Sequence, residues 1–590
     1  MARSEAARNE PGHRGSLRQD TATRNLCAGV YLDPAFCRVV LRRVHNDTTR
    51  MVAPSYGFDL VSVVRHAWWA WGLEMAQHVC VLTIFAIGFA VDPLATFTVA
   101  SGAGFWYLSH LVVRSARVVL PLRAKAAVNK WLRKTRWHSE SDELRQQTRL
   151  LRLSSMGCAV LAVLPFLMAA LSSVPLDDMT RATVFLALLI AVAVGGTGAA
   201  YQWRLNRMHK TESLGPQKLT LRLQAIEDQQ SHPYVIYRRP LLPVDEAEPE
   251  DLLVFKLVDE DQSPFVGSGE LVHRWLPPLT VQLLRSIKDL TDLKEHKPME
   301  ELEPPTPRFE AHELVAYLKN AMGPMGDAND PTGLRGFTMR DRLYIAEADV
   351  PPRPEWLRKR PDQSDIDKII DDPYDAVHHF LEIGASATGE LVTTVFLRVT
   401  VKGRALSLDF AACALTRTPV EYHVLNGFAE SGASAVARSI LLKLFNLPAE
   451  IAGMWRLAEV PLLLTKAIRA RKNRMLKPRR GMAIGAKISI REEKSTPWKH
   501  AQLDEVAIHD HMKLIEQRLL KAVEDFLELH ELDTSTFKKR ATSIINTGVL
   551  NMGGRTEIKQ SAIGPNSQVR ADTREPDKNT EQSSKNEGDQ

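Results

Sequence analysis

Cysteine is scarce in this chain of 590 residues. Its five cysteines (Cys27, Cys37, Cys80, Cys158 and Cys413) are scattered and form no CxxC pair. This distribution argues against a disulfide framework and against a thiolate zinc site, and it fits a reducing compartment. The first 50 residues also lack the basic, apolar and small-residue succession of a cleaved signal peptide. These absences leave an intracellular or membrane protein without a cysteine-based scaffold.

Recognisable catalytic and phosphate-binding motifs are also missing. Gly267-Ser268-Gly269 follows an apolar run but continues into Glu270-Leu271-Val272 rather than a helix, so it predicts a tight turn instead of a phosphate loop. Gly333-Leu334-Arg335-Gly336 fails in the same way. Of the two histidine clusters, His378-His379 and His509-Asp510-His511, the second would place its rings about 200° apart on a helix. We therefore predict no catalytic, cofactor-binding or metal-binding residues and no cofactor, and we lean against an enzyme.

Four long apolar stretches dominate the first third of the chain. They are Trp68–Val91, Leu94–Val113, Ser155–Val174 and Ala182–Tyr201. Each is close to the roughly 20 residues that a helix needs to cross about 30 Å of hydrocarbon. We predict an α-helical membrane domain over 67–203, with four transmembrane helices in two hairpins.

Charge asymmetry predicts the orientation of these helices. The loop over 114–153 contains eleven Lys or Arg and three acids, whereas the two outer turns, at Asp92-Pro93 and at Asp177-Asp178, are short and acidic. Because basic residues stay on the cytoplasmic side, the loop and both termini are expected in the cytoplasm. The expected location is a bacterial plasma membrane, crossed several times.

Three polar residues lie on one face of the first apolar stretch. Glu74, Gln77 and His78 follow at i, i+3 and i+4. Ionisable groups at membrane depth often mark functional sites, so the trio is a candidate intramembrane polar site. The alternative is that Glu74 lies near the cytoplasmic edge and reaches the headgroup region.

The regions around the membrane domain divide by composition. We expect disorder over 1–22, a small cytoplasmic helical segment over 23–66, and a cytoplasmic α/β (α+β) domain over 204–500. Within that domain the sequence predicts strands at Leu252–Val258, Val281–Leu284 and Phe337–Ala346, helices at Ala311–Met322 and Ala433–Phe445, and a hairpin of Leu391–Val401 with Ala405–Leu415. An amphipathic helix is expected within 501–540, a short β tail over 541–569 and disorder over 570–590.

A segment over 448–480 joins an apolar stretch to a basic run. The run consists of Arg469, Arg471, Lys472, Arg474, Lys477, Arg479 and Arg480. An interfacial helix whose basic tail contacts anionic lipid headgroups fits this pattern. The alternative is a buried apolar helix with a solvated basic end. Nucleic acid is a weaker rival because the interleaved aromatics of a single-strand groove are missing.

Both ends of the chain resemble one protein family. The segments Lys487–Glu492, Ile544–Gly554 and Ser561–Gly564, together with Leu26–Asp33 near the start, resemble a family of uncharacterised actinobacterial integral membrane proteins with a large cytoplasmic C-terminal region. The resemblance implies an intact multi-pass protein and no particular activity.

The functional expectation follows from architecture alone. We expect a membrane-anchored cytoplasmic sensor, scaffold or signalling adaptor. A protein partner would dock through the β tail or the amphipathic helix 505–532, and a homo-oligomer is compatible with either. The alternatives are an enzyme with an unfamiliar site in the α/β domain, and an oligomeric channel or transporter.

Overall fold

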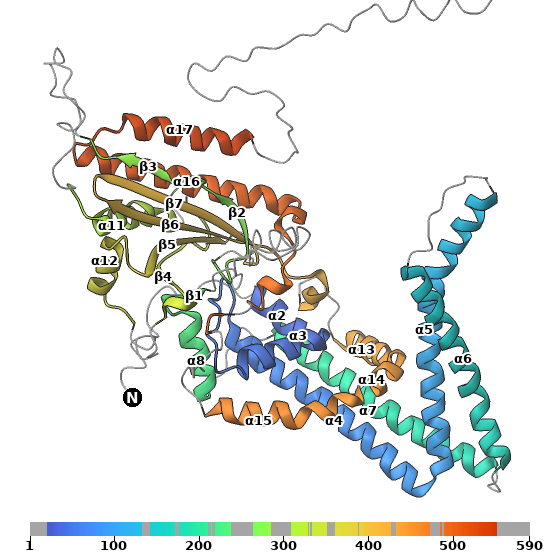
Figure 1. Ribbon diagram of the computed structural model, residues 1–590. Coiled ribbons are helices and arrows are strands. Elements are labelled where there is room, and N and C mark those ends of the chain that lie inside the picture. Colours follow the sequence, from blue (N-terminus) through green and yellow to red (C-terminus); the bar gives the residue numbers. More distant parts are fainter. Residues whose placement is uncertain are drawn as a thin grey trace, which may run out of the picture. The chain divides into compact units, whose positions relative to one another are not determined.

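A computed structural model (Figure 1) describes most of the chain. The described residues are 21–131, 142–171, 176–210, 214, 219–237, 264–284, 308–327, 330, 333–350, 360–386, 389–425, 432–472, 484–486 and 489–550. Residues 1–538 form one compact unit and residues 539–590 a second. The predicted strand Leu252–Val258, the predicted disordered tail 570–590 and residues 1–20 of the predicted disordered start 1–22 lie outside the described residues. Thr21 and Ala22 are helical, so the prediction of disorder is wrong for these two.

Short helices precede the apolar region, as expected. They are α2 (Thr21–Leu32), α3 (Pro34–Val39) and the π-helical η2 (Val40–His45). Asp33 separates α2 from α3 because its carboxylate accepts hydrogen bonds from the backbone of Ala35 and Phe36, which caps the second helix. The carboxamide of Asn25 donates to Glu390 at 2.6 Å, so this segment docks on the later part of the chain.

As far as the structure describes them, the four apolar stretches lie in long helices. These are α4 (Leu60–Val91), α5 (Pro93–Trp131), α6 (Asp142–Leu171) and α7 (Leu176–Lys210). Three of the described helices are long and apolar enough to cross a membrane: Leu60–Val91, Gln146–Pro165 and Asp177–His209. The stretch Leu94–Val113 is helical within α5, but α5 is not among the three.

Helix α4 starts earlier than the apolar stretch that predicted it. Asp59 caps it by accepting from the backbone of Val61 and Ser62. The first four turns are buried in a core shared with α2, α3 and the C-terminal end of α7. The last three turns expose large apolar side chains, among them Leu82, Ile87 and Phe89. The helix thus changes from a protein-covered to an uncovered surface along its length.

A seven-stranded sheet forms the centre of the α/β region. Its strands are β1 (Tyr234–Tyr237), β2 (Glu270–Arg274), β3 (Leu279–Gln282), β4 (Thr338–Ala346), β5 (Val377–Ser386), β6 (Val392–Lys402) and β7 (Ala405–Leu415). The order is β1-β4-β5-β6-β7-β2, and β3 also pairs with β7. Only the β1–β4 pair is parallel. The predicted strands at 281 and 337 and the predicted hairpin, whose turn has Gly403 at φ +59°, are confirmed.

Further helices are described in the same part of the sequence. They are α8 (Leu221–Gln230), α11 (Ala311–Met322), α12 (Gln363–Asp371), α16 (Leu503–Leu529) and α17 (Ser535–Leu550). Helices α11, α12 and α16 contact β6. The apolar face of α16 is buried, and Ile508, Met512 and Ile515 are each at most 2% exposed. The prediction of a β tail is wrong for 541–550, because α17 continues to Leu550; residues 551–569 lie outside the described range.

Candidate functional site

Residues 432–471 fold into a chain of short helices that returns to the long N-terminal helices. They form α13 (Ala433–Phe445), α14 (Leu447–Ala452), the 3-10 turn η8 (Gly453–Glu459) and α15 (Val460–Arg471). Pro448, which has no backbone N–H to donate, lies in the first turn of α14, and this helix ends at Gly453. The segment therefore bends back on itself instead of continuing as one helix.

Helix α13 packs closely on α7. Gly195 of α7 faces Ile440 and Leu444, and a Cβ at Gly198 would lie 3.1 Å from both the Lys443 side chain and the Ser439 carbonyl. The Ser439 hydroxyl also donates to the Gly198 carbonyl at 2.9 Å. Small residues let helix backbones approach each other. Gly195 and Gly198 thus let α13 approach α7 closely.

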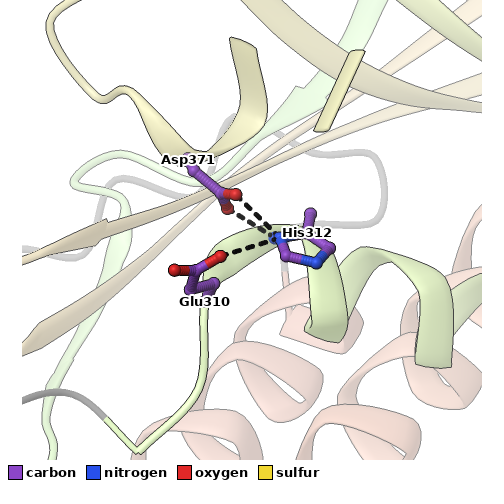
Figure 2. Close-up of side chains that lie close together, drawn as sticks. All are labelled: Glu310, His312 and Asp371. Atoms are coloured by element: carbon purple, nitrogen blue, oxygen red, sulfur yellow. Dashed lines mark hydrogen bonds and ion pairs between the residues drawn. The ribbon is translucent and has the colours of Figure 1, made fainter. Parts of the chain in front are cut away.

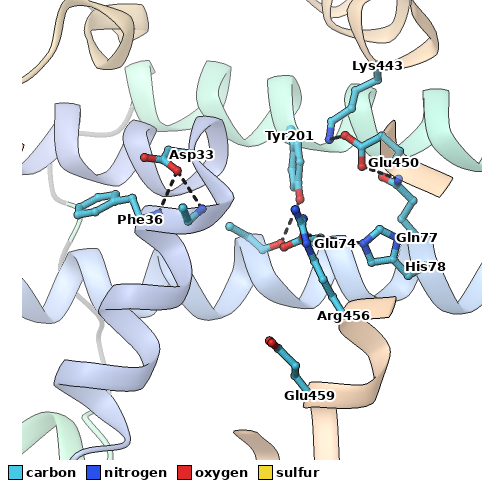
Figure 3. A network of polar contacts seen from close by, with 12 residues as sticks. Asp33, Phe36, Glu74, Gln77, His78, Tyr201, Lys443, Glu450, Arg456 and Glu459 are labelled. Carbon is cyan, nitrogen blue, oxygen red and sulfur yellow. Dashed lines mark hydrogen bonds and ion pairs between the residues drawn. The ribbon is translucent and has the colours of Figure 1, made fainter. Parts of the chain in front are cut away.

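A cation from the segment 432–471 pairs with Glu74 of α4. Arg456 of η8 donates from Nη1 to the Glu74 carboxylate of α4 at 2.5 Å, and Glu74 is 6% exposed (Figure 3). His78 lies one turn further, with Nε2 3.8 Å from the same carboxylate oxygen and no hydrogen bond from either ring nitrogen among the described residues. Glu74 is therefore paired with a cation of its own chain.

Gln77 belongs to a second, adjoining set of contacts. Its amide donates to Glu450 of α14 at 2.9 Å and accepts from the Thr197 hydroxyl of α7 at 2.6 Å. Glu450 in turn accepts from Lys443 of α13 at 2.6 Å. Glu74 and Gln77 thus bind partners from the segment 432–460 and from α7, whereas His78 faces Glu74 on α4 itself (Figure 3). We call Glu74, Gln77, His78, Lys443, Glu450 and Arg456 the junction network.

The contacts of the junction network are of the kind that stabilises a fold. Two acids face two cations, so the buried charges are compensated. Removing one partner of a buried pair is strongly destabilising because the other charge stays buried. The network contains no thiol or hydroxyl nucleophile beside a general base, the arrangement that covalent catalysis needs. It holds α4, α7 and the segment 432–460 in one arrangement.

A cluster of possible metal ligands occurs on the α/β region. Glu310, His312 and Asp371 bring their ligand atoms within 4.8 Å of one another (Figure 2). His312 Nδ1 lies 2.7 Å from Asp371 Oδ2 and 3.4 Å from Glu310 Oε2. Two ligands of one tetrahedral zinc at about 2.1 Å lie about 3.4 Å apart, so the shorter distance is that of a hydrogen bond. The cluster is an ion pair that joins the start of α11 to the end of α12.

Charge in this cluster favours protonated histidine. Burial alone would lower the pKa of His312, but the hydrogen bond and the negative charge of Asp371 outweigh it and raise the pKa above its ordinary value. The backbone N–H of His312 also donates to Asp371 at 3.0 Å. The sequence signal for this contact was only the short spacing of Glu310 and His312 at a predicted helix start, which did not indicate the acid 59 residues later.

The glycine turn that looked like a phosphate loop binds a carboxylate of the same chain. The backbone N–H groups of Gly267, at 2.9 Å, and Gly269 donate to the side chain of Glu492. Burial raises the pKa of Glu492 to about 7, against the opposing effect of these two donors. The prediction of a turn rather than a helix mouth is confirmed, since Ser268 closes the turn on the Phe265 carbonyl. The anion-binding groups of this loop are thus occupied internally.

One histidine of each cluster noted in the sequence has a structural partner. His379 Nε2 lies 2.8 Å from Asp341, which Lys319 also contacts. His509 packs its ring edge-on against Trp498. These contacts explain the residues without a ligand.

A buried charged group inside the sheet was not predicted. Arg342 of β4 donates to Glu382 of β5 at 2.5 Å, and the Tyr56 hydroxyl donates to the same carboxylate at 3.0 Å. Arg342 and Glu382 are 1% and 2% exposed. A group so completely covered offers a substrate no approach. Alternation along a strand could have placed these side chains on one face, but only the β4–β5 register brings them together.

The basic run is partly visible. Arg469, Arg471 and Lys472 are exposed at the end of α15. Arg474, Lys477, Arg479 and Arg480 lie outside the described residues. On the other side of α15, Leu463, Ala467 and Ala470 are buried, so one face of the helix is covered by protein.

A small cavity lies near η2. It measures about 30 Å³ and is lined by residues that include Arg43, Asp47 and Arg50. That volume suits one or two water molecules and is far below the several hundred Å³ of a typical organic-ligand site.

Comparison with known proteins gives one match. Residues 278–558 match the family model of the AbeC-like domain. No curated protein and no solved structure matches the chain. The matched region begins just before β3 and includes Lys443, Glu450 and Arg456, but not α4 or α7. An AbeC-like domain thus covers the C-terminal region, and the junction network joins it to the helices that precede it.

Proposed function

We propose that this protein is a membrane-anchored scaffold or signalling adaptor, whose AbeC-like region is held against its own membrane helices. The observation that carries the proposal is the pairing of Arg456 with Glu74 at 2.5 Å, 382 residues apart in sequence. A flexible tether would need no such contact. A buried ion pair between the anchor and the soluble region makes them one mechanical unit, through which a change at one end could bias the other.

The anchor in this proposal consists of four transmembrane helices, with Leu94–Val113 of α5 as the fourth. The basic loop and the acidic turns support cytoplasmic termini, in a bacterial plasma membrane. The depth of Glu74 agrees with this orientation. It lies 17 residues before Val91 at the end of α4, about 26 Å at 1.5 Å per residue. That distance places the Glu74–Arg456 pair close to the cytoplasmic edge of a hydrocarbon layer of about 30 Å. The resemblance to actinobacterial integral membrane proteins is in keeping with the same arrangement.

Helix α15 is the proposed contact with anionic headgroups. Its described cations Arg469, Arg471 and Lys472 are exposed, and the basic run continues beyond them. Each cation near an anionic surface contributes about 1 kcal/mol. Because α15 follows directly on the residues that contact α4, it lies at the level where the headgroups are expected. Nucleic acid remains the weaker candidate.

The partner in this proposal is another protein or a second copy of the chain. The apolar face of α16 is already used against the sheet, which leaves the exposed Leu503, Val506 and Leu529 at its two ends for such a contact, besides the C-terminal tail. These side chains are separate and small in number, which fits a regulated contact rather than a permanent interface.

The two alternatives have less support. For an enzyme, the candidate clusters among the described residues are those at Glu310 and Arg342. The cluster at Glu310 is an exposed ion pair, and the cluster at Arg342 is fully covered by protein. For a channel, polar residues would have to line the interior of the bundle. Glu74 and Gln77 instead bind partners from their own chain.

The test is an affinity purification of the intact protein from its native membranes in mild detergent, with bound proteins and small molecules identified by mass spectrometry. The wild type is compared with Arg456→Gln, which breaks the junction network, and with Arg469→Gln, which removes an exposed cation of the same segment. A scaffold or adaptor predicts a stoichiometric protein partner that is retained by Arg469→Gln and reduced in Arg456→Gln. Recovery of a metabolite without any stoichiometric protein would overturn the proposal in favour of an enzyme.

A further inference from the structure

The segment 432–460 leaves the C-terminal end of α7, runs along this helix and then turns back. Its first residue, Gly432, accepts a hydrogen bond from the Asn206 side chain near the C-terminal end of α7. Helix α13 then runs antiparallel to α7, until Ile440 and Leu444 face Gly195. This is an advance of 11 residues along α7, or about 16 Å. The segment returns through η8, where Glu459 pairs with Arg42 of η2.

The tip of this path contacts the apolar parts of three long helices. Leu447, Ile451 and Met454 pack on a cluster formed by Val81, Ile190 and Val194 of α4 and α7. Phe445 packs against the rings of Trp106 and His110 of α5, with centroid distances of 6.4 and 5.0 Å. The tip thus lies beside the apolar parts of α4, α5 and α7, further along α4 toward its C-terminal end than Glu74. Figure 1 shows α13 and α14 beside α7.

The outer face of this path is apolar. Leu441, Leu442, Phe445 and Trp455 are 66, 54, 60 and 65% exposed, and Val184 and Val192 on α7 are equally exposed at 67 and 64%. Water would make such an exposed patch costly, at about 25 cal/mol for each Å². The exposed apolar side chains of α7 are those of a helix apolar enough to span a membrane, where lipid would cover them.

Charges along the path are few and paired. Between Arg438 and Arg456 the only charged residues are Lys443 and Glu450, which bind each other at 2.6 Å. The turn at the tip is also satisfied, because the backbone N–H groups of Ala449 and Glu450 donate to the Asn446 carbonyl. Irregular backbone is tolerated at membrane depth where protein surrounds it. Thirteen helical residues span about 20 Å, too little to cross a bilayer.

We propose that residues 432–460 form a re-entrant hairpin, which dips into the bilayer from the cytoplasmic side beside α7 and whose outer face is covered by lipid acyl chains. The proposal rests on the proposed membrane anchoring and adds a membrane-embedded element to the AbeC-like region itself. The occupant of the apolar face is lipid rather than a second copy, since this face continues the exposed surface of the candidate membrane helix α7.

The experiment uses the full-length protein with Cys80→Ser and Cys158→Ser, which remove the cysteines that are not buried. A single cysteine is introduced at Leu442, labelled with bimane and reconstituted in phosphatidylcholine vesicles with or without doxyl-labelled acyl chains. Val192→Cys on α7 is the membrane control, and Leu503→Cys, at an apolar position 85% exposed on α16, is the aqueous control. Leu441→Cys serves as a second hairpin site should Leu442→Cys fail to fold.

The expected result is a loss of fluorescence at position 442 equal to that at 192, and none at 503. Quenching at 192 but not at 442 overturns the hairpin proposal and leaves the membrane anchor intact. Absence of quenching at both positions overturns the anchor as well. If 442 escapes quenching while the unlabelled Leu442→Cys thiols of two copies are joined by a bifunctional maleimide, a second copy covers the face and the lipid assignment is wrong.

Discussion

The Glu74–Arg456 pair gives the sharpest prediction of stability. Replacing Arg456 by Gln leaves the Glu74 carboxylate, 6% exposed, without the cation that lies 2.5 Å away. Breaking a fully buried pair costs about 3 to 5 kcal/mol. The Arg456 side chain is 28% exposed, so water compensates part of the loss and we expect about 2 kcal/mol. At 1.36 kcal/mol for each factor of ten, the docked segment should open about 30-fold more often.

Opening can be measured by thiol labelling. A cysteine at Leu463, which is 3% exposed in the buried face of α15, reacts only when the segment leaves its site, so its labelling rate reports the opening equilibrium. The assay uses the Cys80→Ser, Cys158→Ser background in mild detergent. Arg469→Gln is the matched control, because Arg469 lies on the exposed side of the same helix. Its labelling rate should change by about twofold or less.

A double-mutant cycle separates the pair from its surroundings. Glu74→Gln alone leaves Arg456 without its anion, but Glu74→Gln with Arg456→Gln leaves two neutral amides. The double variant should therefore open less often than the sum of the two single effects predicts, with a coupling of about 1 kcal/mol or more. Strict additivity, or an Arg456→Gln variant that labels no faster than Arg469→Gln, would refute the assignment of Arg456 as the partner of Glu74.

Three further predictions concern the α/β region, each measured by denaturant unfolding of the purified full-length protein. Gly269→Ala should destabilise the fold by more than about 3 kcal/mol, because the new Cβ would lie 2.0 Å from the Ala414 carbonyl and Gly269 has a φ of +94°. Gly403→Ala, at φ +59° but with open space around the new Cβ, should cost about 1 kcal/mol. Equal losses of stability in the two variants would contradict the clash at Gly269. Glu492 has a folded pKa of about 7, above its unfolded value, so it stabilises at low pH and this contribution is lost as the pH rises through 7; Glu492→Gln should flatten that slope, by up to about 3 kcal/mol between pH 4.5 and 8. The pKa of His312 is raised by Asp371, so the pair stabilises at pH 6 and fades as the pH rises through the folded pKa; Asp371→Asn should cost up to about 1 kcal/mol at pH 6 and little at pH 9, and a pH-independent loss would argue against the ion pair.

The elements that the sequence predicted well depend on local patterns. Helix Ala311–Met322 was placed at its observed bounds because Leu314, Val315 and Leu318 repeat at helical spacing. The strands of the β6–β7 hairpin were placed within one residue, since two apolar runs flank a glycine turn. In both cases a single stretch of chain contains the signal. The β tail predicted from residue 541 was wrong over 541–550, because helix α17 continues to Leu550.

The junction network was only half predictable. The sequence placed Glu74, Gln77 and His78 on one face of α4, because helical spacing alone decides this. It did not indicate their partners, which lie 373 and 382 residues away. Arg456 lies within the stretch 448–480, which the sequence predicted as an interfacial or buried helix, and nothing in that stretch indicates a pairing with Glu74.

The charges of the segment 432–460 show why hydropathy alone could not place it. A window centred on Lys443 or Glu450 contains a full charge, so its average resembles that of a soluble helix. In the fold, the seven-residue spacing brings these two side chains together at 2.6 Å across the turn at Asn446, and Gln77 adds a third contact. Paired charges cost far less at membrane depth than the sum of two isolated ones. The useful sequence signal is therefore a lysine and an acid on either side of a helix break, with apolar residues around them. A second part of the signal is a pair of glycines on the neighbouring helix, such as Gly195 and Gly198. That combination predicts a hairpin that enters the membrane domain without crossing it.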